Sequence, residues 1–146
     1  MHTEHEMLVA APPEAVFAAA ADVERWPALH RAYRWCRVLE RSPDRLVFEM
    51  AGVIRGWPAR WTAVQERDAA AGRIVFRHIR GITAGMLVEW RLRPQRPGTA
   101  VTLTHDLVMR WPLVGRLVSD LIVGPMFIDW IARHTLRVVG QAAEGA

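Results

Sequence analysis

The sequence predicts an α+β domain in which a curved antiparallel sheet wraps around one long C-terminal helix. Two observations support this class: apolar residues recur at helical spacing from Trp111 to Val139, and they mostly alternate along short strands from Tyr33 to Met109. Each strand has one apolar face to bury, and only the C-terminal helix is large enough to cover those faces. We therefore expect a single domain over residues 1–146.

The apolar stripe of the C-terminal helix is wide and falls into two halves. The first half comprises Leu113, Val114, Leu117, Val118, Leu121 and Ile122, and the second comprises Ile128, Ile131, Thr135 and Val138. Pro125 lies between the halves and predicts a kink. Arg116, Asp120 and Asp129 interrupt the run before it reaches the ~20 apolar residues of a membrane span. We therefore expect no transmembrane helix.

The N-terminal part predicts one strand and two short helices. Thr3 to Ala10 alternates weakly, as an edge strand does, and ends before Pro12-Pro13. Glu14 to Val23 is rich in alanine, and Pro13 suits its first turn. A second short helix follows at Arg25 to His30.

Six further strands follow, joined by tight turns. The segments are Tyr33–Glu40, Arg45–Ile54, Trp57–Arg67, Arg73–Arg80, Met86–Arg93 and Val101–Met109. For Arg73–Arg80 the alternation leaves two inner faces open, one with Ile74, Phe76 and His78 and the other with Val75, Arg77 and Ile79. In the last two segments it places Trp90 and His105 on the inner side.

Composition is that of a globular chain, with 51% hydrophobic and 23% charged residues. All nineteen basic residues are arginine, the net charge is +4 and the pI is about 10.8. This balance favours acidic partners, but the arginines are scattered without a basic run, so we expect no nucleic-acid interface. The lone Cys36 excludes an internal disulfide and, with an N-terminus unlike a signal peptide, predicts a cytoplasmic protein.

The inward positions of the strands describe the wall of a cavity. Its apolar members are Trp57, Trp61, Met86, Trp90 and Leu103, and its polar members are His30, Tyr33, Gln65 and His105. Three indoles present about 150–250 Å² each, which is more apolar surface than one helix need cover. Each tryptophan alone is also compatible with ordinary core packing. Together they favour a binding pocket.

Several short motifs resemble a known superfamily. They are Ala11-Pro12-Pro13-Glu14-Ala15-Val16-Phe17, then Trp26-Pro27, Tyr33, the strand of Trp61, Trp90, and Gly98-Thr99. This pattern, which spans essentially the whole chain, resembles the START-like helix-grip proteins and within them the bacterial polyketide cyclase/aromatase branch. The resemblance implies a deep apolar cavity, with Trp26 among the ligand-binding residues, and a role in antibiotic biosynthesis.

The resemblance also directs attention to individual positions. Relative to the family, Gln65 stands where an arginine is a proposed participant, and Ala63 stands where a serine is found. Gln65 can donate a hydrogen bond but carries no charge, so Arg77 is a candidate substitute if it points inward. Asp129 falls near a family asparagine that faces the cavity, although a pair with Arg133 at i,i+4 is usually a solvated bridge.

A poly-β-ketone in such a cavity needs a weak base, a hydrogen-bond donor to the attacked carbonyl and an acid for loss of water. His105 could be the base and the acid if burial leaves its pKa near the working pH, and Tyr33 could be the donor. A histidine that is simply satisfied in the core is an equal alternative. We thus predict a polyketide cyclase/dehydratase that is a monomer or homodimer and receives its substrate from an acyl carrier protein.

Two alternatives remain. One is a non-catalytic carrier of a quinone or lipid, which needs the same cavity without an inward histidine. The other is an RNA- or ribosome-contacting protein, which the scattered arginines disfavour. No metal or other cofactor is expected, because the six histidines show no ligand spacing and no glycine-rich phosphate loop is present.

Overall fold

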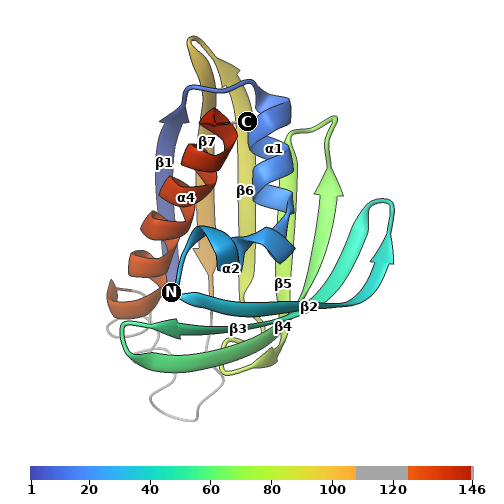
Figure 1. Ribbon diagram of the computed structural model, residues 1–146, viewed down its shortest axis with the longest axis vertical. Helices are drawn as coiled ribbons and strands as arrows, with labels where there is room; N and C mark the ends of the chain where they lie inside the picture. Colours follow the sequence, from blue (N-terminus) through green and yellow to red (C-terminus); the bar gives the residue numbers. More distant parts are fainter. Residues whose placement is uncertain (108–124, 146) are drawn as a thin grey trace.

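The computed structural model describes residues 1–107 and 125–145, which form a curved seven-stranded antiparallel sheet with helices on one face (Figure 1). The strands are β1 (His2–Val9), β2 (Tyr33–Ser42), β3 (Arg45–Ile54), β4 (Trp57–Asp68), β5 (Arg73–Gly81), β6 (Leu87–Gln95) and β7 (Gly98–Asp106). Their spatial order is β1-β7-β6-β5-β4-β3-β2, so β1 is an edge strand as predicted. Strands β2 to β7 form a meander, and β1 closes it against β7.

Two short helices follow β1, which confirms the predicted pair. Helix α1 spans Pro13–Ala21, and α2 spans Trp26–Leu29 after a 3-10 turn at Val23–Arg25. Both helices carry proline in the first turn, where its missing N–H would have no intrahelical partner. The α+β helix-grip class predicted from the sequence is confirmed.

Helix α4 (Asp129–Glu144) packs beside α1 on the inner face of the sheet (Figure 1). Its buried residues recur at helical spacing and include Ile131, Leu136 and Val139. Gly140 lets α4 approach β1 closely, because a Cβ at this position would lie 3.3 Å from Val9 Cγ2. The first half of the predicted C-terminal helix, with its stripe from Leu113 to Ile122, lies outside the described residues.

The Gly98-Thr99 motif joins the start of β7 to the connection between β1 and α1. A Cβ on Gly98 would lie 2.0 Å from the carbonyl oxygen of Val9, so only glycine fits this close approach. The buried Thr99 hydroxyl donates to the Ala11 carbonyl at 2.8 Å. The motif therefore fixes the edge strand and the entry to α1.

The register settles which side of each strand faces inward. On β5, Ile74 and Phe76 are buried, so the inner set is the one that contains His78. On β6 and β7 the inner positions include Trp90 and His105, as the alternation predicted. Because Val88 pairs with His105 and Trp90 pairs with Leu103, these inner residues form cross-strand rows beneath α4.

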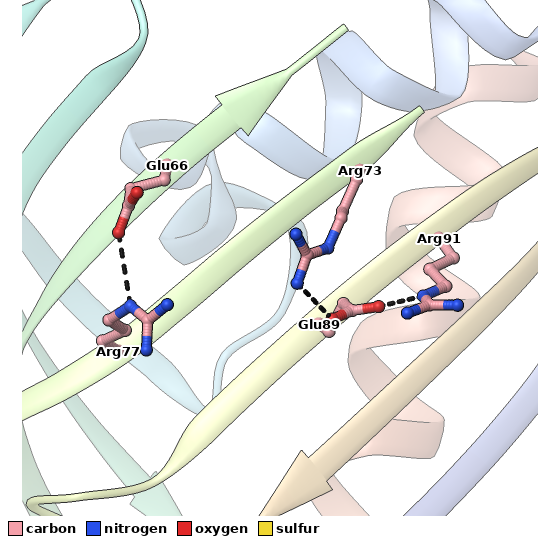
Figure 2. Close-up of polar contacts among 5 residues, drawn as sticks. All are labelled: Glu66, Arg73, Arg77, Glu89 and Arg91. Atoms are coloured by element: carbon pink, nitrogen blue, oxygen red, sulfur yellow. Dashed lines mark hydrogen bonds and ion pairs between the residues drawn. The ribbon is translucent and has the colours of Figure 1, made fainter. Parts of the chain in front are cut away.

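The outer face of the same strands carries charged pairs instead (Figure 2). Arg73 Nη2 lies 2.9 Å from Glu89 Oε2, and Arg91 also bonds to Glu89. Arg77 Nε lies 3.3 Å from Glu66 Oε1. The position of Arg77 on this face corrects the suggestion that it could point into the cavity.

Candidate functional site

A cavity lies between the inner face of the sheet and helices α2 and α4, with a volume of about 90 Å³. The wall is mostly apolar and aromatic, and its polar side chains come from several different elements. Among the lining residues that the structure describes, Arg60 is the one with a permanent charge. Its guanidinium lies 2.9 Å from Glu49, and its side chain is 65% exposed, so this charge is solvated and points away from the interior.

Three tryptophans line the cavity: Trp61 and Trp90, which strand alternation predicted, and Trp26, which the resemblance implied. The Trp26 ring is the centre of an aromatic cluster, with centroids 5.3 Å from Tyr33 and 6.1 Å from Trp90. Its indole N–H donates to the Ala19 carbonyl at 3.3 Å, which ties α2 to α1. Met86 and Leu103, also predicted as lining residues, lie in the same wall. The tilted rings give a rigid apolar surface for a flat ligand.

His105 lies in the cavity wall on β7 and is 7% exposed. Burial in the apolar wall lowers its pKa to about 3, and the nearby His78 and His5 add to this effect. The sequence-based condition that its pKa stay near the working pH is therefore not met. At neutral pH the ring is uncharged, and its Nδ1 atom has no hydrogen-bond partner among the described residues.

Tyr33 lies at the start of β2 and lines the cavity, where it is almost fully buried. Its hydroxyl forms a hydrogen bond with Thr135 Oγ1 of α4, and Thr135 is itself a lining residue. Burial raises the pKa of this phenol, so it is protonated at neutral pH. The site thus has a neutral hydroxyl donor next to the aromatic cluster.

His78 is a site residue for which the sequence left two faces open. Its ring stacks on Trp61 with centroids 5.8 Å apart, and its Nδ1 lies 2.9 Å from Thr83 Oγ1. Burial lowers the pKa of His78 to about 4, so this second cavity histidine is also neutral at pH 7. The burial of Ile74 and Phe76 selects this face, and alternation alone could not do so.

Gln65 points inward as predicted but lies under α1, away from the cavity. It is fully buried, and its Nε2 donates to the Ala21 carbonyl at 2.8 Å. Gln65 is not among the residues that line the cavity. Its amide N–H therefore supports α1 in this structure and does not face the cavity.

Two other predicted binding residues, Trp57 and His30, lie outside the cavity wall. Trp57 is 66% exposed, and its ring packs edge-on against Phe127, so the expectation that it lines the cavity is wrong. His30 packs against the rings of Trp130 and His134, where burial lowers its pKa. The His30 side chain thus belongs to the contact between α2 and α4, and the Trp57 side chain lies at the end of the sheet.

Asp129 also lies outside the wall. Its Oδ1 is 2.6 Å from His5 Nε2, and its Oδ2 is 3.0 Å from Arg133. The i,i+4 bridge to Arg133 is the one the sequence suggested, and the contact with His5 connects α4 to β1. Asp129 thus anchors the start of α4 and is not placed in the cavity wall.

The described residues contain no cluster of three or more histidine, cysteine, aspartate or glutamate side chains able to hold a metal ion. Within the same part of the chain, no helix is long and apolar enough to cross a membrane. Burial raises the pKa of the Cys36 thiol to about 12, which disfavours the reactive thiolate.

Comparison with known proteins places this chain in a family. The profile of the family described as polyketide cyclase / dehydrase and lipid transport matches residues 9–122. The chain belongs to this family. The granaticin polyketide synthase bifunctional cyclase/dehydratase of Streptomyces violaceoruber is 36% identical over 106 residues, which are 70% of this chain and 33% of that protein.

Solved structures of polyketide cyclase family members share the whole fold. The Zhui aromatase/cyclase from Streptomyces sp. R1128 superposes with a TM-score of 0.83 at 25% identity, over 99% of this chain and 93% of the other. The di-domain aromatase/cyclase BexL of the BE-7585A biosynthetic pathway gives a TM-score of 0.75 at 28% identity, over 99% of this chain and 46% of that one. The predicted resemblance is thus confirmed.

Some residues of the wall in this polyketide cyclase family member escaped sequence reasoning. They are Phe48, Met50 and Ile54 of β3, Ile82 and Thr83 of the β5–β6 turn, and Ile128 and Ala132 near the start of α4. Those on β3 could have been found, because Phe48 and Met50 alternate along the strand. The turn residues carry no periodic signal, so only the folded chain brings them to the site.

Proposed function

We propose that this protein is a polyketide aromatase/cyclase that holds a poly-β-ketone in the cavity and directs aldol ring closure and loss of water. The single observation that carries the proposal is the cavity itself, in which three indoles surround the side chains of Tyr33 and His105. Membership of the polyketide cyclase family supports the same reaction class. The proposed cytoplasmic location rests on the sequence alone.

The reaction balances without a redox partner. The enol carbon of one 1,3-diketone unit attacks a second ketone carbon, so a C–C bond forms and the C=O π bond breaks. The enol oxygen loses its proton and the new alkoxide gains one. Loss of the resulting hydroxyl with a neighbouring hydrogen releases water and begins to aromatise the ring.

Tyr33 and His105 are suited to the two proton movements. The Tyr33 hydroxyl donates its one proton to the ketone oxygen where negative charge develops, and the Thr135 hydroxyl then donates to the Tyr33 oxygen. His105, with its pKa lowered to about 3, is too weak a base to hold a full charge. It acts as a neutral relay that takes the enol proton at one nitrogen as the other gives one up.

The wall must move to admit a substrate of this size, because the cavity of about 90 Å³ has room for roughly six to nine water-sized spheres. Met50 and Met86 both line the cavity and have flexible thioether side chains. Their rotation widens the space between the tryptophans without breaking the sheet. The methionines therefore set which chain length enters.

The proposed partner is an acidic acyl carrier protein. The chain has a net charge of +4, Arg55 lies in the turn between β3 and β4, and Arg60 of β4 is a wall residue whose side chain is 65% exposed. Complementary charge would raise the association rate more than the affinity. An Arg55→Glu, Arg60→Glu double variant should slow transfer from the carrier, with transfer of a free thioester as the control.

The test of the cyclase function is reconstitution with a minimal polyketide synthase and analysis of the products by mass spectrometry and NMR. Trp90→Phe and His105→Gln should each shift the products from the enzyme-directed ring pattern toward spontaneous ones. Trp57→Phe and Arg77→Gln change an indole and a charge outside the cavity, so their products should match the wild type. Unchanged products from both cavity variants would exclude the proposed function.

A non-catalytic carrier of a quinone or lipid is the second candidate. The observation that favours it is that both cavity histidines are neutral at pH 7, since burial lowers the pKa of each. Mass spectrometry of an organic extract of protein from its native host separates the two functions. An aromatic polyketide supports the cyclase, whereas an isoprenoid quinone or an acyl lipid supports the carrier.

A further inference from the structure

Two buried nitrogen atoms on the cavity wall have no hydrogen-bond partner among the described residues: Trp90 Nε1 and His105 Nδ1. Both side chains line the cavity and are at most 7% exposed. Leaving a buried polar atom unpaired costs about 1–3 kcal/mol, and native structures contain few such atoms. Four other buried side-chain atoms of the described residues also lack a partner, at Thr3, His5, Gln65 and Arg67, but these residues are not in the wall. Trp90 and His105 are the two whose missing partners a ligand in the cavity can supply.

The two residues lie on neighbouring strands and on the same inner face. Trp90 pairs with Leu103, and His105 pairs with Val88, so the two side chains are diagonal neighbours across β6 and β7. Diagonal pairs in an antiparallel sheet are roughly 7–8 Å apart, so one rigid molecule with two ring systems spans both. The indole N–H is a donor only, whereas a neutral imidazole nitrogen accepts or donates according to its tautomer.

The charges around the cavity disfavour an anion. Arg60 is bonded to Glu49 and its guanidinium lies over the Trp35 ring, with 5.4 Å to the centroid, so it faces away from the interior. Burial holds His78 and His105 neutral at pH 7 by lowering the pKa of each. A carboxylate drawn into this wall would lose its hydration without gaining a cationic partner, which is costly.

We propose that the cavity selects neutral aromatic phenols and ketones over the corresponding carboxylates, with Trp90 and His105 as the residues that recognise the ligand oxygens. The proposal deepens the function above and rests on the same cavity being the ligand site. It makes the substrate class an uncharged, oxygen-bearing aromatic or enolic molecule. Fatty acids and aromatic acids are excluded.

The test uses three probes of similar shape, namely naphthalene, 2-naphthol and 2-naphthoate, with binding measured by ligand-observed NMR titration of the full chain at pH 7. The wild type should bind 2-naphthol about tenfold more tightly than naphthalene, as one net buried hydrogen bond provides. It should bind 2-naphthoate more weakly than either. Binding of 2-naphthoate as tight as that of 2-naphthol would overturn the proposal.

Variants that keep an aromatic side chain and remove its nitrogen separate recognition from packing. Because 2-naphthol carries a single hydroxyl, Trp90→Phe or His105→Phe, whichever residue bonds to that hydroxyl, should weaken 2-naphthol binding about tenfold and leave naphthalene binding unchanged. Trp57→Phe is the matched control, because this indole lies outside the cavity, and it should change neither affinity. An equal loss for naphthalene and 2-naphthol in both cavity variants would show a packing role and refute the inference.

These outcomes distinguish the inference from the cyclase function. If naphthalene and 2-naphthol bind equally, the inference is refuted while the cavity stays the ligand site. If selective binding holds but the cavity variants leave the cyclised products unchanged, the cyclase function fails and the inference stands. If none of the three probes binds, the inference is refuted as well.

Discussion

The two faces of strands β5 and β6 treat polar groups differently. Successive residues along each strand point alternately to the outer face, which carries ion pairs, and to the inner face, which lines the cavity. On the outer face, the solvent-exposed side chains of Arg73 and Arg91 bond to Glu89 (Figure 2). One residue further along, Trp90 faces inward with a buried N–H that lacks a partner among the described residues. Charges are thus paired where water could have satisfied them, and neutral polar atoms are unpaired where water is excluded.

This contrast between the faces points to the inner face as the one on which the proposed ligand binds. Exposed ion pairs contribute about 0–1 kcal/mol each, so the outer network can be changed at little cost. A buried polar atom on the inner face that makes no hydrogen bond costs free energy. We therefore look for a ligand that would bond to it. Four experiments test the contrast between the faces.

The largest expected effect comes from Trp90→Ala. The side chain is 1% exposed and packs against Trp26, so its removal should lower the free energy of unfolding by about 3–5 kcal/mol. Arg91→Ala, at the next position on the outer face, should change it by about 0.5 kcal/mol or less. Urea denaturation followed by circular dichroism measures both, and similar losses for the two variants would contradict the contrast between the faces.

The second effect is a loss of stability in mild acid. Unfolding returns the pKa of His78 and His105 from about 4 and about 3 to the ordinary value of 6.5, so the unfolded chain binds more protons. Stability should therefore fall as the pH drops from 6.5 toward 4, by roughly 2 kcal/mol for each histidine at pH 5. Denaturation at pH 7.5 and pH 5 measures this drop.

Removal of either buried histidine should reduce that acid-induced loss. His78→Gln and His105→Gln should each flatten the pH dependence by about half, because each removes one group that titrates on unfolding. His2→Gln, at the exposed end of β1, should leave the drop as it is in the wild type. A pH dependence that survives in the double variant would assign the acid lability to other groups.

The third effect concerns Gln65, which is inward but away from the cavity. Gln65→Met keeps most of the volume and removes the hydrogen bond to the Ala21 carbonyl, so stability should fall by about 1–3 kcal/mol. Affinity for 2-naphthol should stay within twofold of the wild type. A large loss of affinity with normal stability would place Gln65 in the ligand site, as the sequence comparison first suggested.

The smallest effect is expected for Trp57→Ala. This side chain is 66% exposed and contacts Phe127, so stability should change by about 0.5 kcal/mol and the cyclised products should be unchanged. Thermal unfolding and the reconstituted assay measure both outcomes. Altered products would show that the rim beyond the described wall takes part in substrate binding.

Strand alternation was sufficient to predict most of the fold and half of the site. A period of two fixes the facing of Trp90, Leu103 and His105 once one neighbour is known to be buried. It fails for Trp57, which has the inward parity but is 66% exposed at the start of β4. It also leaves β5 undecided, since Arg77 and His78 are adjacent and both of its faces contain apolar residues.

The remaining errors concern how deeply a side chain is buried and which residues from other elements surround it. Gln65 has the predicted parity, but α1 covers that end of the sheet, and a pattern within one strand does not contain this information. The pKa of His105 depends on how completely the wall excludes water, which is a property of the assembled cavity. Asp129 meets His5 across 124 residues of sequence, a contact that no local spacing predicts.

The pairing of β1 with β7 has a consequence for how the chain emerges from a ribosome. His2 pairs with Asp106 and Val9 pairs with Thr99, so β1 has no partner until about a hundred further residues are synthesised. The β2–β3 and β3–β4 hairpins can form as they are translated. Strand β1 stays unpaired until β7 is made, and an unpaired strand is accessible to chaperones. A stalled nascent chain that ends before Gly98 would thus hold a partial sheet in which β1 has no partner strand.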